Sequence, residues 1–545
     1  YTVMKKFYQK IVEHPKSILT LFILAAVFSL FCQRLVRVNY DIKDYLPEKS
    51  PSTIALDKME EKYEGGIPNA RVMIRDTSVA EALEYKEKLE GCPGVVSVTW
   101  LDDAANIEQP LETLDQELAE TYYKNGNALF TVTVEEDQVL DAVEAMEEVA
   151  GDRGAMSGDA VSTAVATTST VSEVYKIAAF AVLFVFFVLF LTTTSWAEPV
   201  IVMAGLGIAI AINAGTNLIF GEISFVTNAA GNILQLAVSL DYSVFLIHRF
   251  EECMKTEETP RKAMVEALCK STSSILSSGL TTVIGFLALV FMQFKIGPDL
   301  GLALAKGVTI SLITVFVFMP VLILALNGWL MKTHHRRLLP DFHRFGFLVR
   351  KIMVPMTAVF ALLVVPSYLA SNQNTFYYGS AYIFGEDTEL GRDIAEIEEI
   401  FGKSDTYALM IPRGDKVREE QLSQALHEIP EVTGILSYID TVGAQIPEEY
   451  LDEELLSQLL SKDYSRMVLT VDADAEGEEA FALVEKIRET ADTYYPDSWY
   501  LAGAGVSTYD LMDTITADMV KVNLIAIAAV FVVLLFTMKS VSLPV

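Results

Sequence analysis

The sequence lacks the motifs and the cysteine pairs that mark several common classes of protein. It has only 4 cysteines in 545 residues. Cys92 alone lies in a segment that we expect to form an external domain, so no disulfide within a domain and no cysteine metal site is predicted. The patterns GxxxxGK[S/T], HExxH and GxSxG do not occur, which argues against direct use of ATP and against the hydrolases that carry these motifs. We expect a protein that is not an enzyme, has no cofactor or metal, and does not bind nucleic acid.

Charge is nearly absent from eight long stretches of the chain. The sequence has 72 acidic and 41 basic residues, yet 52% of it is hydrophobic and the mean hydropathy is +0.34, so apolar and charged segments must alternate. Each apolar run approaches the ~20 residues that cross ~30 Å of hydrocarbon as a helix. The runs lie at about 17–36, 175–194, 199–220, 225–247, 273–294, 299–327, 353–370 and 521–538. We therefore predict a polytopic α-helical membrane protein with eight transmembrane helices.

Basic residues gather on one side of the predicted spans. They are frequent in the N-terminal segment and in the loops after the fourth and sixth spans, whereas the loop after the fifth span has Lys295 alone. The positive-inside rule then places the N-terminus in the cytoplasm. Segments 38–172 and 372–518 fall outside, and they hold the acidic excess behind the net charge of −31. Such acidity is typical of a solvated surface, and recruitment of cationic substrates is the alternative.

A tandem repeat relates the two halves of the chain. Residues 156–200 align with residues 501–545 without a gap. The copies share a glycine, a Val-Ser-Thr triplet, a lysine and a proline, at 158/503, 161–163/506–508, 176/521 and 199/544. Six spans separate the copies, so they have the same orientation, as in transporters built from parallel repeats. Only one span follows the second domain, and we expect the sequence to be truncated from a protein of twelve spans.

The repeat and the apolar runs together divide the chain into seven parts. These are the N-terminus with the first helix at 1–37, a first extracytoplasmic domain at 38–172, helices two to six at 173–328, a cytoplasmic linker at 329–352, helix seven at 353–371, a second extracytoplasmic domain at 372–518 and helix eight at 519–545.

Both extracytoplasmic segments alternate between helical and strand-like patterns. In the first, helices at 53–64, 79–90, 110–123 and 138–150 are interleaved with strands at 70–74, 95–100 and 128–134. In the second, the helices are at 389–401, 417–428, 449–460 and 476–491, and the strands are at 406–411, 432–438 and 466–472. The shared order predicts two small α+β domains of the ferredoxin-like type.

The fourth apolar run contains an acidic residue deep within the predicted span. Asp241, followed by Tyr242, lies well inside 224–252. An ionisable side chain at such a depth costs at least ~2.5–3.5 kcal/mol on insertion scales, which makes a functional role the default hypothesis. A carboxyl group there holds its proton more readily than in water, so we predict that Asp241 carries protons and that Tyr242 assists by hydrogen bonding.

Polar side chains surround Asp241 in two stripes at helical spacing. The first stripe follows the fourth span through Asn228, Asn232, Gln235, Ser239 and Tyr242, and the second follows the fifth span through Ser274, Ser277, Ser278 and Thr281. We predict that the two stripes face each other inside the bundle or along a water-filled path, with packing contacts between helices as the alternative.

Three further charged residues lie in or near the spans. Lys306 of the sixth span either snorkels to the surface or acts as a charge partner of Asp241. Glu198 and Glu222 are assigned to loops.

The repeat, the two external domains and the segment LDYSVFLIHRFEE at 240–252 resemble the resistance–nodulation–division (RND) superfamily, and most of all its MMPL-type branch. The family motif corresponds to Leu240, Asp241, Tyr242, Phe245 and Arg249. The run at 277–289 and the Pro320 region are similar to the fifth and sixth spans of the family. Two features depart from the pattern: a second Asp-Tyr pair is absent, and Lys306 stands where an apolar or small residue is usual.

This resemblance implies proton-motive-force-driven export of lipids or other hydrophobic and amphiphilic molecules across a bacterial cytoplasmic membrane. Protons would be the coupling ion, and membrane lipids and a hydrophobic substrate would be the partners of a monomer or a trimer. The alternatives are multidrug efflux, a lipid- or sterol-sensing receptor of the Patched type, and an accessory of protein translocation similar to SecDF.

Overall fold

The computed structural model describes residues 2–40, 43–63, 66–107, 109–114, 116–135, 138–335, 343–371, 384–385, 387–441, 443, 453–538 and 540–541. Residues 336–342 of the predicted linker, the start of the predicted second domain at 372–383 and residues 449–452 of a predicted helix lie outside this part.

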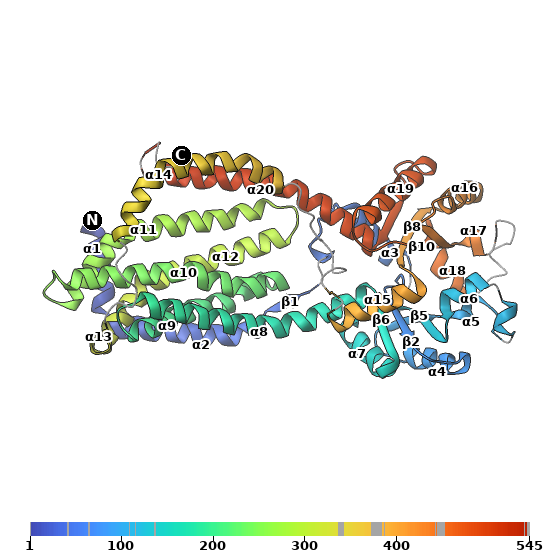
Figure 1. Ribbon diagram of the computed structural model, residues 1–545, viewed down its shortest axis with the longest axis horizontal. Helices are drawn as coiled ribbons and strands as arrows, with labels where there is room; N and C mark the ends of the chain where they lie inside the picture. Colours follow the sequence, from blue (N-terminus) through green and yellow to red (C-terminus); the bar gives the residue numbers. More distant parts are fainter. Residues whose placement is uncertain are drawn as a thin grey trace. The chain divides into compact units, whose positions relative to one another are not determined.

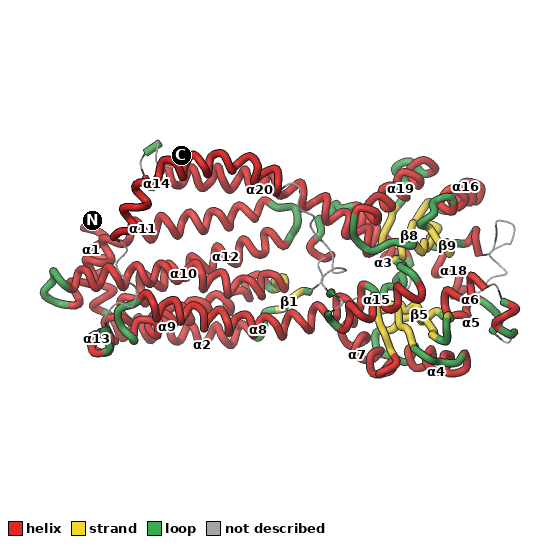
Figure 2. The backbone as a smooth tube through the Cα atoms, viewed as in Figure 1, coloured by secondary structure: helices red, strands yellow, loops and turns green. Residues whose placement is uncertain are grey.

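The chain divides into two compact units. One unit comprises Tyr1–Tyr40, Val171–Phe376 and Ala517–Val545, and it contains the long apolar helices. The other comprises Asp41–Thr170 and Tyr377–Thr516, and it contains a five-stranded and a four-stranded sheet. Figure 1 follows the elements along the chain by colour, and Figure 2 shows the strands of these sheets in yellow.

The described part of the membrane unit has seven helical stretches that are long and apolar enough to cross a bilayer. They are α2 (Pro15–Gln33), α9 (Ala197–Thr216) with a 3₁₀ turn to Phe220, α10 (Phe225–Met254), α11 (Pro260–Ala288) with a turn to Phe291, α12 (Ile296–Ile313) continued by a π-helical turn into α13 (Met319–Lys332), α14 (His343–Ser371) and α20 (Ala504–Met538). The predicted second span is the shorter apolar half, Lys176–Thr192, of α8 (Asp159–Thr192). An amphipathic helix, α1 (Thr2–Glu13), precedes α2.

Helices α9, α10 and α12 form the core of the membrane unit. Leu206, Leu246 and Val308, one from each of these helices, are almost completely buried. Small residues permit close approach at the edges of this core. A Cβ atom on Gly215 of α9 would lie 2.2 Å from the Ser29 carbonyl oxygen of α2, so only glycine fits there. In contrast, the described side chains of α14 are almost all exposed.

In the first sheet of the α/β unit the strands lie in the order β3 (Val95–Thr99), β5 (Asn127–Val134), β2 (Ala70–Ile74), β6 (Gly154–Ser157), and the short β4 (Tyr123–Lys124) pairs with β5. All these pairs are antiparallel. Helices α4 (Val79–Glu90) and α7 (Val139–Ala150) pack on one face, which displays Val72, Phe130 and Val132. Two short helices, α5 (Leu101–Ala104) and α6 (Gln116–Tyr122), follow β3.

The second sheet repeats this arrangement. Its order is β9 (Val432–Leu436), β10 (Tyr464–Val471), β8 (Asp405–Pro412), β11 (Tyr500–Gly503), again antiparallel. Helices α16 (Lys416–His427) and α19 (Glu478–Tyr494) cover the face with Leu409, Ile411 and Leu469. The short helices α17 (Tyr438–Thr441) and α18 (Glu453–Leu459) take the places of α5 and α6. Both halves thus have the β-α-β-β-α-β order.

The two halves exchange one helix each. Because alternate residues of a strand point to opposite faces, each sheet has a second apolar face. On the first sheet, Met73, Leu129 and Ala155 are covered by Ile397 of α15 (Glu389–Phe401), a helix that belongs by sequence to the second half. On the second sheet, Ala408, Met410 and Ala502 are covered by Ala55 and Met59 of α3 (Pro51–Lys62), which belongs to the first half. Each half completes the core of the other.

The six strands predicted from the sequence are present, and their limits agree to within two residues. The prediction missed β6 and β11, the strands at one edge of each sheet. Helix α15 has the predicted limits, whereas the predicted helix 110–123 is shortened to a 3₁₀ turn and α6.

Candidate functional site

The start of α10 is held in place by a carboxylate from α12. Ser224 caps the helix, since its hydroxyl accepts from the Thr227 backbone N–H at 3.1 Å. Asp299 accepts from the Ser224 backbone N–H at 2.7 Å and from the Thr227 hydroxyl at 2.6 Å. Just before this cap, β7 (Glu222–Ser224) pairs in parallel with β1 (Arg37–Asn39). These contacts fix the direction in which α10 enters the bundle.

The central part of the polar stripe on α10 packs into the core of the bundle. Gln235, Ser239 and Tyr242 are only 1%, 0% and 5% exposed. Gln235 donates from Nε2 to the Gly307 carbonyl and to the Ser311 hydroxyl, both at 3.0 Å, and its Oε1 accepts from Asn213 at 2.9 Å. Here Gln235 joins α10 to α9 and α12, as the packing alternative expects.

Asp241 lies on a different side of α10. It is exposed, together with Leu234, Ala237 and Phe245, which follow at helical spacing. Asp241 and Tyr242 therefore lie on different sides of α10, one at the surface of the unit and the other in its core. Lipid contact with a charged carboxylate at this depth costs several kcal/mol, so this face requires a protein or water partner when the carboxylate is ionised.

The hydroxyl stripe on α11 is only partly buried. Ser274 and Ser278 are exposed, while Ser277 and Thr281 are half-buried. The Thr281 hydroxyl donates to the Ser278 carbonyl of its own helix at 2.7 Å. No hydrogen bond joins the two stripes in the described chain, and the facing of the two stripes remains a prediction.

Lys306 does not pair with Asp241. Its ammonium group donates to the Asn213 carbonyl, the Thr216 hydroxyl and the Asn217 side-chain oxygen at 3.0, 2.9 and 2.7 Å. These acceptors lie in the last turn of α9 and just beyond it, where carbonyl groups lack helical partners and a cation is favoured. Among the described residues Lys306 forms no ion pair, so the structure does not support the alternative in which it is a charge partner of Asp241.

A polar pocket lies beside Lys306, and we call it the amide pocket. Its volume is about 190 Å³. The polar residues that line it come from α2, α9, the 3₁₀ turn after α9, and α10: Gln33, Asn213, Asn217, Thr227, Asn228 and Asn232. Val36, Val38 and Ile223, from β1, β7 and the turn before β1, supply apolar lining. The predicted residues Asn228 and Asn232 therefore belong to this pocket, away from Asp241.

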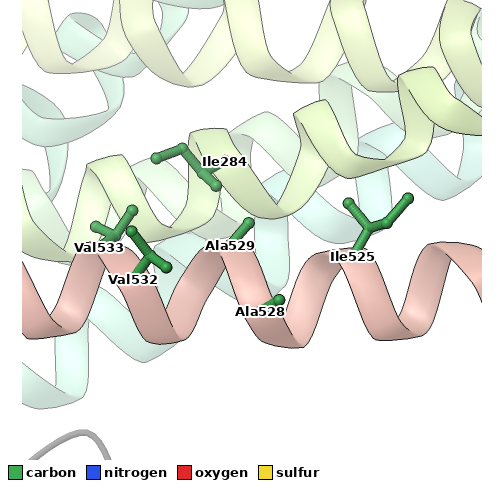
Figure 3. Close-up of a pocket in the computed structure, with 6 residues that line it drawn as sticks. All are labelled: Ile284, Ile525, Ala528, Ala529, Val532 and Val533. Carbon is green, nitrogen blue, oxygen red and sulfur yellow. The ribbon is translucent and has the colours of Figure 1, made fainter.

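A second, wholly apolar groove lies between α11 and α20. It has a volume of about 480 Å³ and is lined by Ile284 of α11 and by five residues of α20: Ile525, Ala528, Ala529, Val532 and Val533. In Figure 3, Ile525, Ala529 and Val533 lie on the side of α20 that faces α11. The groove offers no polar group that would orient a ligand.

One polar cluster was missed by the sequence analysis. Glu198 is the second residue of α9 rather than part of a loop, and it is fully buried. The Thr194 hydroxyl lies 3.1 Å from a Glu198 oxygen and 2.6 Å from a Glu251 oxygen of α10. The sequence shows that Glu198 is a charged residue between two apolar runs. It does not show that Glu198 is buried, because the burial depends on how α9 packs against α10. Among the described residues no group of three or more His, Cys, Asp or Glu is placed to hold a metal ion.

These features define a multi-span helical membrane protein with a duplicated α/β unit. Residues 44–355 and 384–545 match the MMPL family, so the chain belongs to this family, whose members are transporters.

Curated relatives share shorter segments with the chain. The membrane protein SCO5905 of Streptomyces coelicolor is 24% identical over 348 residues, which cover 60% of this chain and 39% of that protein. The transport protein MmpL12 of Mycobacterium tuberculosis is 29% identical over 133 residues, covering 24% of this chain and 12% of MmpL12. The protein translocase subunit SecD of Desulfurispirillum indicum is 33% identical over 97 residues, or 17% of this chain and 18% of SecD. The chain thus spans well under half the length of these relatives.

The fold is similar to that of the hedgehog release protein Disp from the water bear Hypsibius dujardini. The TM-score is 0.57 at 11% identity, over 99% of this chain and 84% of that chain. At this identity the likeness concerns the fold alone.

Proposed function

We propose that the protein exports lipids or other hydrophobic molecules across a bacterial cytoplasmic membrane, driven by the proton-motive force, with Asp241 as the proton carrier. Membership of a transporter family supports this proposal. The observation that carries it is the acidic Asp241 within the long apolar helix α10, where an ionised group is expensive to maintain.

Asp241 performs its role by changing charge on an otherwise apolar face. When protonated, the side chain is compatible with an apolar partner; when ionised, it requires water or a polar partner. The neighbouring face of α10, with Gln235, Ser239 and Tyr242, is anchored in the core. Loss of the proton therefore favours movement of the protein segment that packs on the Asp241 face, while α10 itself stays in place. Another part of the protein or a second copy of the chain supplies this segment.

The two α/β halves are the extracytoplasmic, ferredoxin-like domains of the exporter in this proposal. Their exchanged helices couple them, because displacement of one half drags a helix that completes the core of the other. The substrate passes between or beside these domains after it leaves the membrane.

The test is transport by the full chain in liposomes under an imposed pH gradient. A fluorescent phosphatidylethanolamine reports movement between leaflets, because an impermeant quencher reaches only the outer leaflet. We expect gradient-dependent movement that falls at least tenfold in Asp241→Asn, with unchanged thermal unfolding. The control is Glu258→Gln, which removes a carboxylate from an exposed ion pair with Lys262 and leaves transport intact. Full transport in Asp241→Asn contradicts the proton-carrier role.

The same assay separates the neighbouring hypotheses. Gradient-driven movement of ethidium in place of the lipid indicates multidrug efflux. Equal lipid binding by wild type and Asp241→Asn, with no transport by either, indicates a sensor of the Patched type.

A role as an accessory of protein translocation is the second candidate. The similarity to SecD supports it. In that case the lipid stays in place, and the defect of Asp241→Asn appears in the amount of a secreted reporter protein.

A further inference from the structure

The amide pocket is unusual for a cavity between apolar helices, because carboxamides dominate its polar lining. Four asparagines, Gln33 and Thr227 line it, and none of the lining residues is charged. The nearby Lys306 ammonium is directed to the end of α9 by three hydrogen bonds. The pocket therefore offers neutral donors and acceptors rather than a net charge.

The hydrogen bonds around Gln235 determine which atom of Asn213 is left without a partner. The Gly307 carbonyl accepts only, so the Gln235 amide nitrogen must face it, and the Gln235 oxygen faces Asn213. Asn213 must then donate with its own nitrogen, which leaves its side-chain oxygen as a free acceptor. Asn213 is 2% exposed, and this oxygen has no partner in the described chain. A buried acceptor of this kind calls for a donor from a ligand or from water.

The neighbouring asparagine presents the opposite group. The Asn217 oxygen accepts from Lys306 at 2.7 Å, so its amide nitrogen remains available to donate. Side by side, Asn213 supplies an acceptor and Asn217 a donor. A phosphate, sulfate or carboxylate, which only accepts, would leave the Asn213 oxygen unsatisfied, whereas a hydroxyl group both donates and accepts.

The location and lining of the pocket match a headgroup attached to an acyl chain. Asn217 follows the last residue of α9, and Asn228 lies in the first turn of α10, so the pocket is at the end of these spans, where lipid headgroups lie. Val36, Val38 and Ile223 provide apolar surface for C–H groups. The volume of about 190 Å³ is well above the ~10–15 Å³ that one water needs.

We propose that the amide pocket binds an uncharged, hydroxyl-bearing lipid headgroup, such as a glycerol or sugar moiety. The proposal rests on the proposed function in taking the bound lipid as cargo, but binding is measured without a pH gradient. Failure of export and failure of binding are therefore distinguishable.

The experiment uses the full chain in phosphatidylcholine nanodiscs with three diazirine-bearing probes of the same acyl length. One is a monoacylglycerol, one is lysophosphatidic acid, in which phosphate replaces a glycerol hydroxyl, and one is a fatty alcohol. We expect the monoacylglycerol to label the chain most strongly, with unlabelled monoolein competing. Asn213→Leu reduces this labelling roughly tenfold, because the buried acceptor is lost.

Two further variants protect the test against misfolding. Asn228→Leu removes a lining amide for which the structure shows no hydrogen bond, and it reduces labelling without disturbing the Gln235 contacts. Asn327→Leu, a carboxamide of α13 outside the pocket, leaves labelling unchanged. Equal labelling by all three probes indicates acyl partitioning alone and overturns the proposal. Stronger labelling by lysophosphatidic acid than by the monoacylglycerol also overturns it. So does unchanged labelling in both Asn213→Leu and Asn228→Leu, which is the result expected of a cavity filled only by water.

Discussion

The two α/β halves have the same topology, but they hold their exchanged helices in different ways. On the first sheet, α15 is held by a partly exposed ion pair: Arg75 donates to both oxygens of Glu396, at 2.8 and 2.6 Å. On the second sheet, α3 is held by a buried group: Asp510, 5% exposed, accepts from the Ser52 backbone N–H at 2.7 Å at the start of α3. Duplication has preserved the apolar contact of each helix, whereas the polar attachment has diverged.

The polar attachments of the two exchanged helices therefore differ in how far solvent and salt weaken them. An exposed ion pair is screened by salt and contributes little. Removal of a buried carboxylate that accepts hydrogen bonds from the first turn of a helix and from a guanidinium costs much more stability. The second half should therefore be the more sensitive of the two to loss of its polar attachment.

The largest effect is expected from Asp510→Ala. Asp510 also accepts from Arg488 at 2.8 Å and from the Ser50 hydroxyl at 3.1 Å. Its removal leaves the largely buried Arg488 charge and the start of α3 without their acceptor, at a loss of about 3–5 kcal/mol. Thermal unfolding of the full chain measures this loss. Asp513→Ala, at an exposed position of α20, the helix that also contains Asp510, should change stability by less than about 0.5 kcal/mol. Equal effects of the two substitutions would contradict the assigned role of Asp510.

Intermediate effects are expected from truncation of the apolar contacts. Ile397 of α15 and Met59 of α3 are 0% and 6% exposed. Ile397→Ala and Met59→Ala should each destabilise by about 2–5 kcal/mol, since both leave cavities between a helix and a sheet. Denaturant unfolding gives the two values, with the exposed Val417→Ala as control. A value near zero for one of them would show that its helix is not docked as described.

The smallest effect is expected from Glu396→Gln, and it depends on pH and salt. The Arg75 guanidinium holds the pKa of Glu396 below its ordinary value. A carboxylate with a lowered pKa stabilises the fold above its unfolded pKa, and this contribution disappears as the pH falls through the folded value. The difference between wild type and Glu396→Gln should be about 0.2–1 kcal/mol at neutral pH.

Unfolding measured from neutral to acidic pH, at low and high salt, checks this prediction. The difference should vanish below the folded pKa of Glu396 and shrink at high salt. A difference that grows on acidification would contradict the role assigned to the Arg75–Glu396 pair.

The sequence predicted the spans and most strands because these depend on local pattern. Strand β2 matches its predicted limits, 70–74, since ARVMI combines β-forming residues between turn signals. Strand β6, GAMS, is short and begins with glycine, so no local pattern marks it. The exchange of α3 and α15 between the two halves could not be predicted from the sequence either. Amphipathic spacing shows that α15 has an apolar face, but not which sheet that face covers.

The candidate site was predictable in its residue types but not in their directions. Asn228, Asn232, Gln235, Ser239 and Tyr242 do share a helical stripe. Two of these residues line the amide pocket, and the other three pack into the core. Which side of α10 faces α12 is decided by tertiary packing. For that reason Asp241, one step around the helix, is exposed rather than enclosed with Tyr242.

The helix exchange has a consequence for the order of events at the ribosome. The first sheet is complete once β6 has emerged, yet the face with Met73, Leu129 and Ala155 has no cover until α15 is made, after all the helices from α8 to α14. At ~5–20 residues per second this interval lasts on the order of tens of seconds. During that time the nascent chain exposes a hydrophobic surface, and a chaperone or the translocation machinery must cover it to prevent aggregation.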